Sequence, residues 1–144
     1  MRRTPCYLPL PLLCLALGIG SLAAQRPRDL STPATRLVGH WLNLSDSTHL
    51  YFGPTDPTTH TGTVRQRAAG SGGRVVRFRY TIGPQAPVGE QIAVEIVSSD
   101  GAHWCERYHR FRVAPDGQAM TRSFLCGDIM VQQIFRYLDA RTVP

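Results

Sequence analysis

The segments Val75-Val-Arg-Phe-Arg-Tyr-Thr-Ile82 and Gln91-Ile-Ala-Val-Glu-Ile-Val-Ser98 decide the fold class of this 144-residue chain. In both, every second residue is large and apolar, and the residues between them are mostly polar or small. Successive side chains of a β-strand point to opposite faces, so this period of two predicts strands with one buried face. The two segments therefore predict a sheet that covers a core.

Short apolar or alternating stretches continue on both sides of this pair. The eight expected strands are Leu37–Leu44, His49–Gly53, Thr61–Arg67, Val75–Ile82, Gln91–Ser98, Trp104–Val113, Ala119–Cys126 and Met130–Leu138. Turn residues such as Asp100-Gly101 and Ala114-Pro115-Asp116-Gly117 separate them and suit hairpins. We expect an all-β antiparallel barrel of eight strands, although a partly open barrel or a sandwich fits the same stretches.

The last stretch is ambiguous, because Val131, Ile134, Phe135 and Leu138 also fit one face of a helix. We interpret it as a strand.

The first 24 residues have the composition of an export signal. Arg2 and Arg3 are followed by an apolar run from Tyr7 to Ile19 and by small residues near Ala24. Pro9 and Pro11 interrupt that run, which is shorter than the roughly 20 residues of a membrane-spanning helix. We expect a cleaved signal peptide, a secreted or periplasmic protein and no stable membrane anchor.

The remaining chain divides into a flexible lead-in and one domain. Residues 25–36 contain two prolines and few apolar side chains, which predicts a flexible lead-in. Residues 37–144 have the length of one domain, and we assign the barrel to them.

Cleavage of the signal removes Cys6 and Cys14 and leaves Cys105 and Cys126 in an oxidising compartment. If Val113 pairs with Gln118 across the turn, Cys105 lies opposite Cys126, so a disulfide fits the hairpin. A redox-active pair is the alternative, but the close spacing of Cys-x-x-Cys is missing.

The charge of the chain comes from arginine alone. The formal net charge is +6, and the sequence contains no lysine. With abundant glycine, alanine and proline, this indicates the coding bias of a GC-rich, bacterial genome. An arginine surface for phosphate, anionic lipid or an acidic polymer is the functional alternative.

The segment Leu37-Val-Gly-His-Trp41, ahead of a meander of short strands, resembles the opening of the lipocalins and their calycin relatives. The resemblance covers nearly the whole mature domain. It implies an eight-stranded up-and-down barrel whose base is closed by Trp41, with Gly39 allowing a close backbone approach.

Two other calycin branches share part of this pattern. Gly39-x-Trp41-x-Asn43 followed by Ser47 looks like the start of avidin-type biotin binders, in which the matching Asn and Ser contact the ligand. Small periplasmic protease inhibitors share the size, the export and the single disulfide, and their N-terminal arm corresponds to residues 25–36.

No catalytic motif is present. The chain has no Gly-x-Ser-x-Gly elbow and no phosphate-binding glycine loop before a helix. His103, Cys105 and His109 on one extended strand would spread over about 20 Å, too far for one metal ion. Export and the modest net charge argue against nucleic acid as a partner. We expect no enzyme activity, no cofactor and no metal.

We therefore expect a non-enzymatic binding protein for a small apolar or amphipathic ligand. The candidate cavity-lining residues are Trp41, Phe78, Tyr80, Ile92, Val94, Tyr108 and Phe124. An inward arginine would suit a ligand carboxylate, but the sequence does not identify which one. The alternative is a protein-interaction module, such as a protease inhibitor or an envelope-associated structural domain, that uses the arm or the loops 54–60 and 83–89.

Overall fold

The computed structural model describes residues 27–83, 91–98 and 105–139, and within them the chain forms one short helix and eight strands. The elements are α1 (Pro33–Leu37), β1 (Gly39–Asn43), β2 (His49–Phe52), β3 (Thr61–Arg67), β4 (Val76–Ile82), β5 (Ile92–Ser98), β6 (Tyr108–Val113), β7 (Ala119–Cys126) and β8 (Ile129–Asp139). The expected signal peptide and the expected Asp100-Gly101 turn lie outside the described residues.

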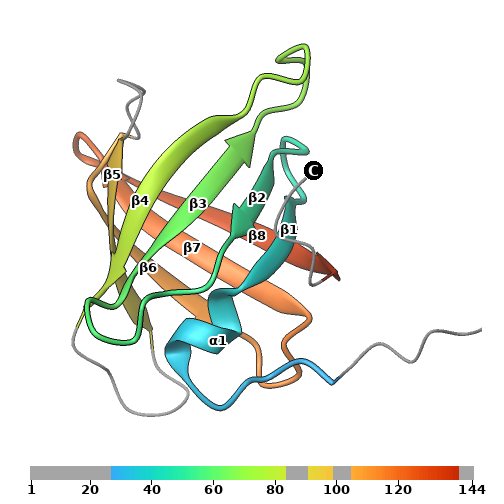
Figure 1. The fold of residues 1–144 in the computed structure, drawn as a ribbon. Coiled ribbons are helices and arrows are strands. Elements are labelled where there is room, and N and C mark those ends of the chain that lie inside the picture. The colour runs from blue at the N-terminus through green and yellow to red at the C-terminus, as the bar shows by residue number, and fades with distance from the viewer. Residues whose placement is uncertain (1–26, 84–90, 99–104, 140–144) are drawn as a thin grey trace, which may run out of the picture.

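The eight strands form a closed barrel. Each strand pairs antiparallel with the next one, and β8 returns to pair with β1. Figure 1 shows α1 across one end of the barrel, while the hairpin of β3 and β4 extends from the opposite end. The expected eight-stranded antiparallel up-and-down barrel is confirmed, and it is closed rather than partly open.

The ambiguous last stretch is a strand. β8 pairs with β7 from Ala119 to Cys126 and also with β1, so its backbone groups are bonded on both sides. A helix at this place would leave two strand edges open, and the closure of the barrel therefore decides between the two periodicities.

The hairpin of β6 and β7 differs from the expectation in its register. Gly117 N donates to the carbonyl of Ala114 (2.8 Å), and Ala114 N donates to the carbonyl of Ala119 (2.8 Å). The loop therefore holds residues 115–118, and Val113 pairs with Met120 rather than with Gln118. The expected register is wrong by two residues, because the four-residue loop is 115–118 rather than 114–117, so that Ala114 faces Ala119.

The disulfide between Cys105 and Cys126 is nevertheless present, with the two Cα atoms 5.0 Å apart. β6 begins at Tyr108, four residues later than expected, and Cys105 lies in the irregular segment before it. That segment passes the end of β7, so the pair forms without direct strand pairing.

Residues 33–36 of the expected lead-in form most of α1. Thr32 caps α1 through a reciprocal pair of hydrogen bonds with Thr35, and Leu37 is fully buried. Trp41 Nε1 donates to the carbonyl of Leu37 (2.8 Å). The helix is thereby fixed over the start of β1.

Arg28 completes the closure at the α1 end. Its guanidinium lies 3.9 Å from the ring centroid of Tyr137 and 4.6 Å from that of Trp41. It also donates to the carbonyls of Gly117 and Arg36. Cation–π contacts and hydrogen bonds to carbonyls explain why a charged residue packs here.

Candidate functional site

The half of the barrel interior nearest α1 is a packed core. The largest side chains there expose essentially no surface, either to bulk solvent or to an internal void that would admit a water molecule: Trp41, Phe52, Tyr80, Phe111 and Phe135. The ring of Phe52 meets that of Tyr80 edge-on at 5.2 Å between centroids and that of Phe111 at 5.5 Å. Eight strands enclose just enough space for side chains to fill. No room for a ligand remains at these residues.

At the opposite end of the interior, the inward side chains are less deeply buried. Burial falls there from complete to partial at six inward positions on five strands: Gln66, Val76, Ser98, Phe124, Val131 and Gln133. We call this ring of half-exposed inward side chains the mouth. It is mixed in character, because aliphatic and aromatic groups alternate with amides and a hydroxyl.

Arg122 of β7 forms the floor of the mouth. It faces inward between Met120 and Phe124 and is only 6% exposed. Its Nε donates to His109 Nδ1 (3.2 Å), its Nη1 donates to Gln133 Oε1 (3.1 Å), and its guanidinium lies 4.4 Å from the ring centroid of Phe124. The pKa of Arg122 is lowered to about 9 by burial, which the negative charge of Asp46 partly opposes. It remains a cation at neutral pH.

His109 is neutral, and its tautomer follows from its partners. The carbonyl of Glu106 lies 2.7 Å from His109 Nε2 and can only accept, so Nε2 carries the proton. Nδ1 is then the acceptor for Arg122. Burial and then the charge of Arg122 lower the pKa of His109 to about 3, against the opposing effect of the hydrogen bond to Glu106.

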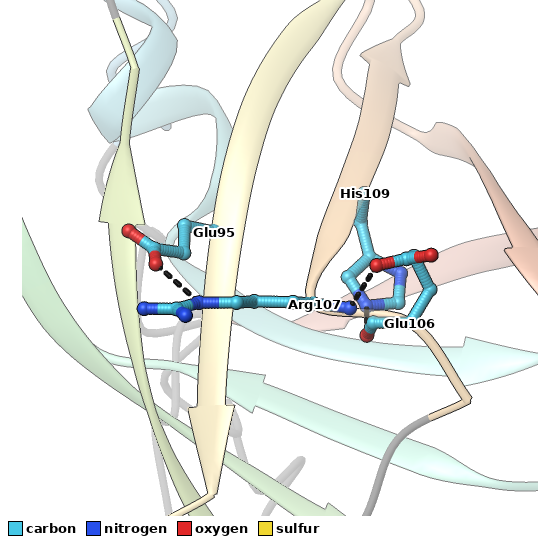
Figure 2. Close-up of polar contacts among 4 residues, drawn as sticks. All are labelled: Glu95, Glu106, Arg107 and His109. Carbon is cyan, nitrogen blue, oxygen red and sulfur yellow. Dashed lines mark hydrogen bonds and ion pairs between the residues drawn. The ribbon is translucent and has the colours of Figure 1, made fainter.

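The segment that holds this carbonyl is fixed from outside the barrel. Figure 2 shows Arg107 reaching across to Glu95, with its Nε 2.5 Å from Glu95 Oε1. The backbone N of Arg107 donates to Glu106 Oε1 (2.7 Å), and the disulfide of Cys105 ties the same segment to β7. These contacts position the Glu106 carbonyl beneath His109, and His109 in turn positions Arg122.

Two further donors near this end have no partner among the described residues. Asn43 Nδ2 and Ser98 Oγ are buried and make no hydrogen bond within that part of the chain. The register places Asn43 opposite Phe135 of β8, next to Gln133, whereas Ser98 lies on β5 across the barrel. Buried polar atoms normally find a partner, so each of these calls for an acceptor.

The expected cavity-lining residues separate into three sets. Trp41, Phe78, Tyr80, Ile92 and Val94 face inward but belong to the packed core. Tyr108 points outward and is 64% exposed, because Phe111 and Val113 face inward and the alternation places Tyr108 on the other face. Phe124 alone lies at the mouth.

Of the polar residues of the site, the sequence singled out only Asn43, through the resemblance to avidin-type binders. The alternation of β7 offered a signal for Arg122, which lies midway between two large apolar residues, Met120 and Phe124. No such signal existed for Gln133, whose relation to Arg122 depends on the register of β8. Among the described residues, no three His, Cys, Asp or Glu side chains gather as a metal site.

Comparisons with known proteins found no match among protein-family models, curated proteins or solved structures. Within the described residues, no helix has the length and apolar character needed to span a membrane.

Proposed function

We propose that the protein is an exported, non-enzymatic binding protein for a small amphipathic molecule that carries a carboxylate or similar anionic group. The observation that carries this proposal is the inward Arg122, a cation at the floor of a half-exposed mouth. Ionisable groups with perturbed pKa values cluster at functional sites.

The chemistry of the mouth specifies the kind of ligand. Arg122, Asn43 Nδ2 and Ser98 Oγ all donate, so the ligand supplies acceptor oxygens. Phe124 and Val131 offer the apolar contact for the rest of the molecule. Because the core beneath is filled, the ligand occupies the mouth and does not reach the α1 end.

Other observations agree with this role. The resemblance to lipocalins through Gly39 and Trp41 favours ligand binding inside a barrel. The expected export signal favours the periplasm or the medium, and a disulfide between Cys105 and Cys126 suits such compartments.

The test compares two probes of equal chain length, decanoate and decanol, by titration calorimetry. A charge-assisted hydrogen bond contributes about 1.5–3 kcal/mol, so decanoate is expected to bind at least about tenfold more tightly. Arg122→Met removes this difference, whereas Arg112→Met, a matched change on the exposed outside of β6, preserves it.

Three results would contradict the proposal: equal binding of the two probes, no binding of either, or an unchanged preference in Arg122→Met. If Arg122→Met does not fold, Phe124→Ala replaces it. Phe124 is half-exposed at the mouth, and its truncation is expected to weaken both probes.

A protein-interaction module is the second candidate, and one observation favours it. Large apolar side chains are exposed on β7 and β8: Leu125, Met130, Ile134 and Leu138 on the outside of the barrel, and Ile129 at the start of β8. Beside them, a groove of about 430 Å³ runs between Tyr108 and Arg110 of β6 and Met130. Clustered exposed apolar surface is typical of interaction sites.

A photo-crosslinking residue at position 134, compared with one at position 81 on the outside of β4, tests this candidate in the producing cell. A single protein captured at 134 and not at 81, and lost in Met130→Lys, supports it. Equal capture at both positions contradicts it.

A further inference from the structure

Positive charge is concentrated on the outside of β3 and β4 and on the loop that joins them. The five arginines are Arg65, Arg67, Arg74, Arg77 and Arg79, and we call this surface the arginine face. From Pro57 to Gly89 the sequence has no aspartate or glutamate. β2, which borders β3, has none either.

The strand register brings these charges together. Arg65 lies directly opposite Arg77 in the ladder, and Arg79 follows two residues later on the same side of β4. Side chains directly opposite each other on one face have Cβ atoms about 4.5–5.5 Å apart, and like charges there destabilise a sheet. The register therefore gathers several positive charges on one outer face of the barrel.

The charge extends to β2. His49 pairs with Arg67 in the ladder, and burial and then the charge of Arg67 lower the pKa of His49. The positive potential of the arginine face therefore already acts on a neighbouring group.

The other groups on this face indicate which anion it suits. Tyr51 lies opposite Arg65 and also points outward, yet it is only 4% exposed, and its ring stacks on His40 at 4.2 Å. It is therefore not available to stack on the bases of a single-stranded nucleic acid. Val75, next to Arg74 in the loop between β3 and β4, is 40% exposed and can enter an interfacial layer.

We propose that the arginine face binds reversibly to a lipid surface that contains anionic phospholipids, with the guanidinium groups on the phosphates and Val75 at the interface. Arginine suits phosphate because its planar fork donates to two oxygens at once. Several cations and one apolar residue are sufficient for peripheral attachment to a membrane. Such attachment does not require a membrane-spanning helix. This inference is independent of the ligand proposed for the mouth.

The experiment measures co-sedimentation with vesicles of equal parts phosphatidylglycerol and phosphatidylcholine, and with phosphatidylcholine alone. Arg65→Gln/Arg79→Gln removes two charges from the arginine face. Arg110→Gln/Arg112→Gln removes two from the exposed outside of β6 and is the matched control. Each arginine near an anionic surface contributes about fivefold, so the first pair is expected to weaken binding about thirtyfold, while the control pair binds like the unsubstituted protein.

Raising the salt to about 0.5 M is expected to release the protein, because exposed charges are then screened within a few ångströms. Equal loss of binding in both double variants would mean that net charge alone is responsible, and it would overturn the proposal. Equal binding to uncharged vesicles would do the same. Binding to dextran sulfate or to single-stranded DNA without binding to the anionic vesicles would assign the face to a soluble polyanion instead.

Discussion

Replacing His109 with glutamine is expected to remove a defined part of the protein's sensitivity to acid. His109 is 1% exposed, and its pKa is lowered from 6.5 to about 3 by burial and by the charge of Arg122. In the unfolded chain neither cause operates, so the side chain takes up its proton near pH 6.5. Between these two pKa values the unfolded state binds one proton more than the folded state.

The size of the effect follows from this difference. The folded pKa is depressed, so the contribution of neutral His109 is complete above pH 6.5 and is lost as the pH falls toward 3. The slope is about 1.4 kcal/mol per pH unit. Because pH 5 lies about 1.5 pH units below the unfolded pKa, His109 accounts for a loss of about 2 kcal/mol between pH 7 and pH 5.

Urea unfolding at pH 7, 6 and 5 measures this loss. His109→Gln keeps a donor for the Glu106 carbonyl and an acceptor for Arg122 but does not titrate, so its stability should fall by about 2 kcal/mol less over this range. His60→Asn is the control, because His60 is exposed and has φ 54°, a conformation that asparagine also adopts. A His109→Gln variant as acid-sensitive as the unsubstituted protein would refute the reasoning.

Three further predictions concern stability and are read from urea unfolding at pH 7. Gly62→Ala is expected to lower the free energy of unfolding by about 1–3 kcal/mol, because the added Cβ would lie 2.6 Å from the buried ring of Tyr80. The control Gly83→Ala, whose nearest contact is at 3.5 Å, is expected to be nearly neutral. Equal effects of the two changes would contradict the packing argument. Reduction of the disulfide, or Cys105→Ser/Cys126→Ser, is expected to cost about 3 kcal/mol for a loop closed over 21 residues, and an unchanged urea midpoint would contradict this. Arg28→Leu loses the carbonyl hydrogen bonds and the two ring contacts and is expected to lower the free energy of unfolding by about 2–3 kcal/mol. Arg28→Lys is not expected to restore this stability, since lysine has no planar fork. Full rescue by lysine would show that the charge alone is sufficient.

The strands were predictable because each carries its own signal. β4 and β5 show the alternation that burial on one face requires. In the structure, both strands end at the residue where the alternating stretch ends, Ile82 and Ser98. The register of β6 and β7 was not predictable in the same way. It depends on whether Ala114 or Val113 makes the last pair, and the turn residues from Pro115 to Gly117 are compatible with both.

The same distinction explains what could be predicted of the candidate site. That Arg122 faces inward follows from its own strand. Its acceptors come from β6 and β8, and only the observed register brings His109 and Gln133 beside it. The arginine face depends in the same way on the register of β3 and β4, because alternation alone places Arg65 and Arg77 on the outside without placing them opposite each other.

On the proposed function, the barrel divides its interior between a packed core and a binding site. At the α1 end, Trp41 and the rings around it exclude water, and Arg28 holds the closing helix in place. Such a core tolerates no ligand, since any added volume would displace side chains that already touch one another. At the mouth, the neutral His109 gives Arg122 an acceptor without giving it a counter-charge, so the guanidinium is oriented while remaining positive. A carboxylate in place of the imidazole would add to the negative charge of Asp46, which already acts on Arg122, and would further weaken the attraction of an anionic ligand. The choice of an imidazole, held by a backbone carbonyl, is therefore the part of the arrangement that best accords with binding.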